Sequence, residues 1–271
     1  MFSFKEKSPT NSSQPMKKLS IISLSVSIAL SALSYKAMAE DPAGSEKISK
    51  NFLKFNLTSA VIKNYSIQYE RILSRGISLG VAYKIMPSSG LPYADNMIKW
   101  FDITDNDTQV LLGDINMENF TITPELRFYS GKKRYGRGFY FALFYRYGQY
   151  KVNNAIIPFE TDFEDGTLNA SFDITSQTGG IMIGAQWALG KHLCLDWWIL
   201  GPHFGVSSGD FTARSSVAFS EAERQDISEE LNGIDIPMFD QSVNVTADRA
   251  TMIFDGPSAG IRAGLSLGIK F

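Results

Sequence analysis

Residues Gly256–Phe271 read GPSAGIRAGLSLGIKF, and their side chains alternate in character along the stretch. One set of alternate positions is apolar: Ile261, Ala263, Leu265, Leu267, Ile269 and Phe271. The set between them holds glycine, serine and cations: Arg262, Gly264, Ser266, Gly268 and Lys270. A period of two predicts a β-strand with one apolar face, because successive side chains of a strand point to opposite sides. A soluble sheet ending here would expose an apolar edge, whereas a sheet closed on itself in a bilayer has no edge.

The same alternation recurs in seven further stretches, so the sequence predicts eight antiparallel strands. The other seven strands are predicted at about 50–60, 65–73, 77–86, 120–129, 139–148, 170–189 and 193–200. Pro124 lacks a backbone donor and predicts a bulge in the fourth strand. The alternation slips near Gly179-Gly180, which predicts a second bulge.

Long loops are predicted at 87–118, 152–168 and 207–253, with short turns at 74–76, 130–138 and 190–191. Because the strand count is even, both termini lie on one side and the long loops on the other. This is typical of an all-β, eight-stranded antiparallel transmembrane up-and-down barrel. The first long loop has a possible helix around Met97–Phe101. In the last, the capping box Ser220-x-x-Glu223 predicts a short helix at 220–232.

The N-terminal residues 1–39 have the pattern of a signal peptide. A basic pair at 17–18 precedes the apolar, serine-rich stretch Leu19–Leu33. Ala39 ends an A-x-A cleavage site, so the mature domain is predicted to span 40–271 and to start at Glu40. Met16, directly before the basic pair, is an alternative start.

Composition excludes several classes of protein. A hydrophobic content of 44% and a mean hydropathy of −0.08 do not fit a helical membrane protein. Cys194 is the single cysteine, so neither a disulfide framework nor a multi-thiolate metal site forms within the chain. Removal of residues 1–39 leaves 21 basic and 27 acidic residues, a net charge of −6. No nucleic-acid partner is therefore expected. No cofactor or metal is expected either.

The polar faces of the predicted strands carry charges of both signs. We expect these side chains to form a network inside the barrel: Glu70, Lys84, Glu125, Arg127, Arg146, Asp196 and Arg262. Opposite charges can pair across a narrow lumen, whereas a lone cation facing lipid costs about 2–4 kcal/mol. A soluble lipocalin-like barrel has the same period with its apolar face inward, and is the alternative. Aromatic residues near strand ends favour the membrane.

In these respects the chain resembles the small bacterial outer-membrane barrels of the OmpA-domain, OmpX and OmpW type. The resemblance implies a monomer in the bacterial outer membrane, with periplasmic termini. It implies membrane lipids, lipopolysaccharide and the outer-membrane assembly machinery as partners. Phe271 would act as the terminal aromatic signal that this machinery reads.

Two stretches contain residues that could form a catalytic or a metal-binding site. Gly205–Gly209 matches G-x-S-x-G, and His203 with Ser207 would suit a lipid-modifying enzyme at the barrel rim, although no strand-to-helix elbow is predicted there. Asp102, Asp105 and Asp107 could bind Ca²⁺ in a loop, but the spacing fails the EF-hand pattern.

The sequence therefore predicts a structural or surface-interaction protein that displays three long acidic loops, and not an enzyme. A narrow channel or carrier for a small apolar molecule is one alternative, which the resemblance to OmpW implies. The rim-site enzyme is the other. The ligand, the biological role, conduction by the lumen, the oligomeric state, Ca²⁺ binding and the role of the helix at 220–232 are left open.

Overall fold

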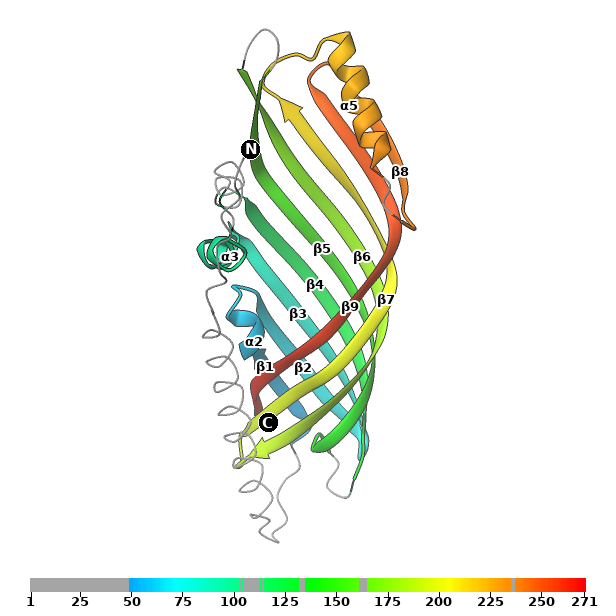
Figure 1. Cartoon of the computed structure of the whole chain (residues 1–271). Coiled ribbons are helices and arrows are strands. Elements are labelled where there is room, and N and C mark those ends of the chain that lie inside the picture. The colour runs from blue at the N-terminus through cyan, green and yellow to red at the C-terminus, as the bar shows by residue number, and fades with distance from the viewer. Residues whose placement is uncertain are drawn as a thin grey trace, which may run out of the picture. The chain divides into compact units, whose positions relative to one another are not determined.

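The computed structural model describes residues 49–102, 104, 113, 115–131, 135–160, 165–234 and 237–271 (Figure 1). These residues belong to one compact unit, Ile48–Phe271. The predicted signal peptide and its cleavage site at Ala39-Glu40 lie outside the described residues. The strands in the described part are β1 (Asn51–Asn56), β2 (Tyr65–Ser74), β3 (Ile77–Gly90), β4 (Asn116–Tyr129), β5 (Gly138–Glu160), β6 (Asp165–Leu189), β7 (Leu193–Ser215), β8 (Asp240–Val245) and β9 (Arg249–Lys270).

The strands form one antiparallel sheet whose hydrogen bonds close into a ring. Each strand from β1 to β7 pairs with the next, β7 pairs with β9, and β9 pairs with β1. Asn51 and Phe271 exchange two backbone hydrogen bonds of 3.0 and 2.9 Å where the ring closes. The predicted antiparallel sheet of eight alternating strands is confirmed as a ring of eight. The ninth strand, β8, was not predicted and pairs with β9 outside the ring.

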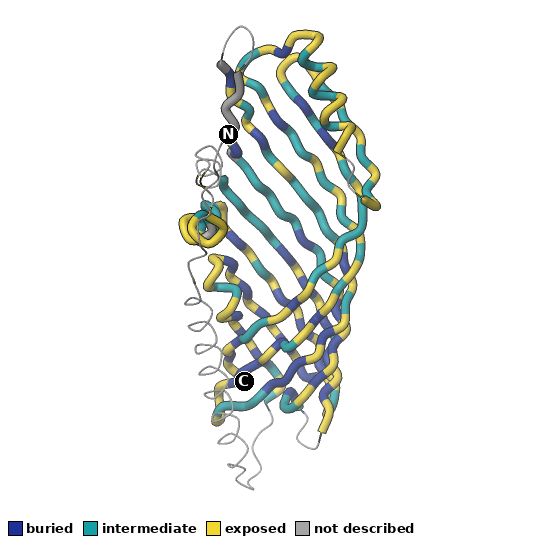
Figure 2. Tube along the Cα trace, in the orientation of Figure 1, coloured by how far each residue is buried: buried dark blue, intermediate teal, exposed yellow. Residues whose placement is uncertain are grey.

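The two faces of the strands differ sharply in exposure, and buried and exposed residues alternate along the ring (Figure 2). In β9, Leu267 and Ile269 are 38% and 48% exposed. Ser266 and Lys270 of the same strand are buried. Most of the largest fully buried side chains are polar or charged, with Arg127 and Lys54 the largest, although Met182 is also among them. The apolar face therefore lies outside the ring and the polar face inside.

Much of the predicted long loops 152–168 and 207–253 is sheet instead. We refer to the end of the ring with Asn51 and Phe271 as the terminal end, and to the opposite end as the loop end. In place of the predicted loop 152–168, β5 continues to Glu160 and β6 begins at Asp165. In place of 207–253, β7 runs to Ser215 and β9 begins at Arg249. In these extensions apolar residues such as Ala155, Ile156 and Phe211 are mixed with polar ones, so no clear period of two marked them as strands.

The irregularities also differ from those predicted. Pro124 pairs with Val81 without a register shift. β3 continues beyond its predicted end at Met86 to Gly90, with a register shift after Met86. The predicted bulge at Gly179-Gly180 is absent. Instead, the register of β7 shifts against both neighbours between Trp198 and Gly201. The extra residue turns Leu200 outward, although uninterrupted alternation along the predicted strand 193–200 would place it on the same face as Asp196.

The helices in the described part are α2 (Leu57–Ala60), α3 (Ala94–Trp100) and α5 (Glu221–Gly233). α2 replaces the predicted end of the first strand, because the Asn56 side chain caps it by accepting a 2.8 Å hydrogen bond from the Ser59 N–H. α3 begins three residues before the predicted helix, and α5 confirms the predicted helix near the C-terminus. Within the described residues, no helix combines the length and the apolar character needed to cross a membrane.

The capping box of α5 is formed as the sequence predicted. The Ser220 N–H donates to the Glu223 carboxylate at 2.7 Å, and the Glu223 N–H donates to the Ser220 hydroxyl at 3.3 Å. The first of these hydrogen bonds lowers the pKa of the Glu223 carboxyl below its usual value. The helix has no buried residue, so its N-terminus depends on this cap.

We expect Ser220→Ala to fray the first turn of α5. Loss of the cap removes about 0.5–2 kcal/mol of helix stability. Hydrogen exchange of the amides of residues 221–224 should become faster, by the factor in the opening equilibrium to which this loss of free energy corresponds. Asp226→Ala, at an exposed position in the middle of the helix, is the control and should leave these rates unchanged. Equal exchange in both variants would show that the capping box does not hold the helix.

Candidate functional site

Six charged side chains meet inside the ring near its terminal end. They are Lys54, Glu70, Glu125, Arg127, Asp196 and Arg262, referred to below as the charge network. Lys54 Nζ contacts both the Glu70 and the Asp196 carboxylates, the latter at 2.7 Å. Arg127 Nη1 also lies 2.7 Å from Asp196, and its Nε donates to Glu125. Three cations thus balance three carboxylates.

Neutral groups complete the hydrogen bonding of the charge network. The Tyr129 hydroxyl donates to Glu70 at 2.6 Å, and the Tyr140 hydroxyl donates to Asp196 at 2.8 Å. The Trp198 indole N–H donates to Asp196 at 3.1 Å. The Arg127 guanidinium lies 4.3 Å from the centre of the Tyr140 ring. Buried charges are tolerated only when they are paired and hydrogen-bonded in this way.

The register of the strands explains why these residues meet. Glu70 of β2 pairs with Gly80 of β3, and Gly80 pairs with Glu125 of β4. A side chain at Gly80 would press on Glu125, since a Cβ there would lie 3.1 Å from Glu125 Cγ. Gly184 leaves the space that the Tyr140 ring occupies, because a Cβ at Gly184 would overlap this ring. Glycine on the inner face therefore makes room for the large polar side chains.

The structure joins five of the seven predicted interior charges in one network and places the other two elsewhere. Lys84 and Arg146 lie nearer the loop end and contact no carboxylate within the described residues. Lys54 was missed, although its place on the polar face of the first predicted strand was a signal. Its role follows only from the register, which pairs Lys54 with Gln68, two residues from Glu70.

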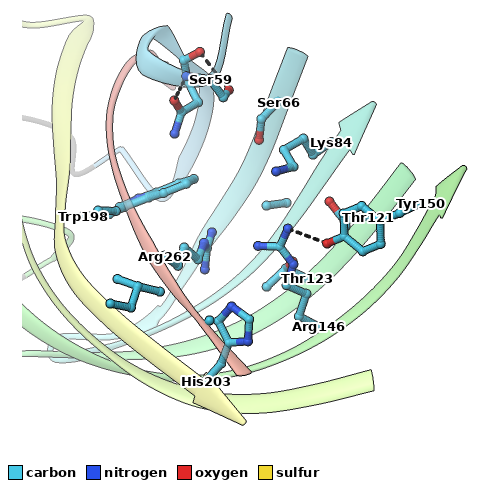
Figure 3. A pocket seen from close by; sticks show the side chains of 15 residues that line it. Ser59, Ser66, Lys84, Thr121, Thr123, Arg146, Tyr150, Trp198, His203 and Arg262 are labelled. Atoms are coloured by element: carbon cyan, nitrogen blue, oxygen red, sulfur yellow. Dashed lines mark hydrogen bonds between the residues drawn. The ribbon is translucent and has the colours of Figure 1, made fainter. Parts of the chain in front are cut away.

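A cavity of about 240 Å³ lies on the loop-end side of the charge network. Four basic side chains point into it: Lys84 from β3, Arg146 from β5, His203 from β7 and Arg262 from β9 (Figure 3). Arg146 donates a 3.1 Å hydrogen bond to the Tyr150 hydroxyl. No aspartate or glutamate is among the described residues that line this cavity. We refer to it as the cationic pocket.

Two buried nitrogens of the cationic pocket have no hydrogen-bond partner among the described residues. They are His203 Nδ1 and Arg262 Nη2. The other terminal nitrogen of Arg262 is held by Glu125 at 2.6 Å. Since buried polar atoms are rarely left without a partner, these two nitrogens mark the wall of the pocket as a place for a polar ligand.

His203 and Ser207 do not form a catalytic pair in this geometry. They lie four residues apart on β7, which separates their Cα atoms by about 13 Å in an extended strand. The Ser207 residue pairs with Ser176 and Gly256, away from the cationic pocket. This distance is too long for the hydrogen bond that a nucleophile and its base require.

The described residues form no ligand cluster for the predicted Ca²⁺ site, and they leave the side chain of Phe271, the predicted assembly signal, exposed. Within the described residues, no three histidine, cysteine, aspartate or glutamate side chains come together as a metal site. Asp102 is exposed, and Asp105 and Asp107 lie outside the described residues. Phe271 is 60% exposed, and only its backbone takes part in ring closure.

The family of the chain follows from comparison with known protein families. A family model described as "Protein of unknown function (DUF3575)" matches residues 29–212. The chain belongs to the DUF3575 family. The match extends through most of β7, so it includes every residue of the charge network except Arg262. No curated protein matches the chain.

Within this DUF3575 chain, the two interior sites differ in kind. The charge network is neutral in sum and buried, and its ion pairs join β1, β2, β4, β7 and β9, so it is suited to closing the ring. The cationic pocket has uncompensated positive charge and free donors, so it is suited to binding an anion.

Proposed function

We propose that this member of the DUF3575 family is a monomeric, integral β-barrel of a bacterial outer membrane. In this proposal the eight-stranded ring spans the bilayer, with both termini on the periplasmic side. Its role is structural or interactive: an anchored barrel that displays the loop end of its sheet at the cell surface. The exposed apolar band around the ring carries this proposal.

The length of the apolar band supports a membrane span. Outward-facing positions are apolar over nine residues in Ile77–Ile85 of β3, Phe139–Tyr147 of β5 and Ile261–Ile269 of β9. A tilted transmembrane strand needs about 9–11 residues. A water-soluble protein rarely leaves so continuous an apolar surface exposed. Beyond the band the outward face of β7 turns polar, with Ser208, Asp210 and Arg214.

The charge network supports a closed lumen. An eight-stranded barrel is just wide enough for its interior side chains to fill. The six charged side chains and their tyrosine and tryptophan partners bond across this width near the terminal end. This arrangement supports the structural role over a narrow channel for a small apolar molecule, because such a molecule would have to pass a charged barrier. The separation of His203 and Ser207 gives the enzyme alternative no support.

The membrane proposal predicts that the mature chain folds only with detergent or lipid. Folded protein should migrate faster than heated protein on a gel, and it should fractionate with outer membranes. In planar bilayers it should show no channel conductance, with a general porin as the positive control. A stable monomer in detergent-free buffer would contradict the membrane location. Steady conductance steps would contradict the closed lumen.

A further inference from the structure

We propose that the cationic pocket binds a phosphate group, and that this group enters through the side of the ring between β9 and α2. The inference goes beyond the structural role proposed above. Only the identification of a membrane lipid as the source of the phosphate depends on the membrane location. The argument rests on charge, free donors, access and size.

The first observation is the excess of positive charge. Lys84 and Arg146 bring two cations into the pocket, and no carboxylate lines it within the described residues. Arg262 adds a third cation that Glu125 holds from the terminal side. Like charges held together at a partly buried place repel one another and raise the free energy of the empty pocket. A multivalent anion would remove this repulsion, whereas a neutral ligand would not.

The second observation is a set of donors that are already in place. Arg262 is held by Glu125 through Nη1 and lies 4.0 Å from the centre of the Trp198 ring, so its position is fixed. Its Nη2 remains a buried donor without a partner, and His203 Nδ1, which donates in the tautomer that carries the proton there, has no partner either. Gly260 leaves the space that the His203 ring occupies, because a Cβ there would lie 2.8 Å from the ring. Donors fixed before binding lose little entropy when the ligand arrives.

The third observation is a break in the strand pairing of the ring. On its β1 side, β9 pairs with β1 through Ser266–Lys270 and with β8 through Ala250–Asp255. Among the described residues, no strand pairs with this edge over 256–265. Helix α2 lies beside β9 here, and Thr58 accepts a 3.3 Å hydrogen bond from the Leu265 N–H. The wall of the ring is therefore incomplete at this level.

The cavity extends to this break. Ile261 and Ala263 point outward from β9, and Ile261 is 71% exposed. Both nevertheless line the same cavity as the inward-facing Arg262 between them. Ser59 of α2 lines it as well. The pocket thus connects the inside of the ring with its outer surface at the break.

The chemistry of the pocket selects phosphate. Arginine presents a planar fork of donors that matches the oxygens of phosphate, and lysine adds a compact charge. A volume of about 240 Å³ holds a phosphate group together with part of the molecule that carries it. The break over 256–265 lies in the loop-end part of the apolar band, because the outward Ala259 and Pro257 of β9 pair with the exposed Phe204 and Val206 of β7. In the proposed membrane its loop-end limit, beside the exposed Asp255, lies at the level of the lipid head groups. A phospholipid or lipopolysaccharide phosphate can therefore enter at the break, and a soluble phosphate compound can enter from the loop end.

The test is calorimetric titration of the folded full-length mature chain in a zwitterionic detergent. The probes are inorganic phosphate, dihexanoyl phosphatidic acid and the neutral dihexanoyl glycerol. The double variant Lys84→Gln/Arg146→Gln should bind the phosphate probe more weakly by about tenfold or more, since a hydrogen bond to a charged group contributes about 1.5–3 kcal/mol. Lys151→Gln, which removes a surface cation paired with Asp173 at 3.0 Å, is the control and should bind as the wild type does.

The outcomes separate the sources of phosphate. Tight binding of phosphatidic acid with weak binding of inorganic phosphate indicates a lipid head group. Equal binding of both indicates a soluble phosphate compound. The proposal is overturned if the wild type binds neither phosphate probe, if it binds the neutral glycerolipid as well, or if the double variant binds like the wild type. Heat-modifiable gel mobility of each variant reports folding separately, so a failure of the barrel proposal is distinct from a failure of the pocket.

Discussion

Replacing Arg127 with methionine is expected to lower the free energy of unfolding by about 3–5 kcal/mol, the usual cost of removing one partner from a buried ion pair. Arg127 lies fully buried and bonds to Asp196 and Glu125. Without it, three carboxylates face only Lys54 and Arg262 inside the ring. An unpaired buried carboxylate raises the free energy of the folded state, because it has lost its hydrating water and the low-dielectric interior offers no group in its place.

Urea unfolding in detergent micelles measures this effect. Tryptophan fluorescence is a suitable signal, because the Trp198 indole bonds to Asp196 in the same network. Arg146→Met is the matched control: it removes an arginine from the same inner face, but one whose hydrogen bond goes to the Tyr150 hydroxyl. Arg146→Met should change the free energy of unfolding by only about 0.5 kcal/mol, as is typical of substitutions outside a buried hydrogen-bond or ion-pair network. Equal losses in the two variants would show that the charge network does not hold the ring.

The double variant Arg127→Met/Asp196→Asn tests whether charge balance is the cause. Asparagine keeps an acceptor for Lys54 and Trp198 but removes the negative charge that Arg127 no longer balances. We expect the double variant to be more stable than the sum of the two single losses predicts, by about 0.5–3 kcal/mol. Strict additivity would mean that packing, and not charge, accounts for the loss in Arg127→Met.

The parts of the fold that the sequence predicted are those where the two faces of a strand differ. Ile77–Ile85 and Ile261–Ile269 alternate without interruption, and the structure places both in the ring with the apolar face outward. The capping box at Ser220 likewise located α5, because its two hydrogen bonds are local. Both features depend only on residues that are close together in the sequence.

The missed parts depend on partners that are distant in sequence. The extensions of β5, β6 and β7 mix polar residues with apolar ones such as Ala155 and Phe211 and have no continuous apolar face, so only the pairing with neighbouring strands makes them sheet. The register shift after Trp198 exchanges the inward-facing and outward-facing positions of the residues that follow it on β7. No residue type in the sequence predicts this shift. Lys54 was missing from the predicted network, and its contact with Asp196, 142 residues away, exists only because the ring closes.

Gly205 should tolerate no side chain, and we expect Gly205→Val to destabilise the ring by about 3 kcal/mol, at the upper end for overpacked sites. A Cβ at this position of β7 would overlap the Gln177 carbonyl oxygen and lie 2.7 Å from Thr178 Cα. Both atoms are backbone of β6. The strand cannot move aside, because Gly205 also pairs with Ser258 of β9 on its other edge.

Gly179→Val is the matched comparison, because Gly179 lies on β6 next to Thr178, the partner of Gly205, and a Cβ there would meet nothing within 4 Å. Since glycine weakens a strand by about 0.5–1 kcal/mol relative to alanine, this variant should unfold at a higher urea concentration than the wild type. Two glycine-to-valine changes on neighbouring strands are thus expected to shift stability in opposite directions. Urea midpoints that shift the same way would mean that β6 and β7 approach less closely at Gly205 than the structure shows.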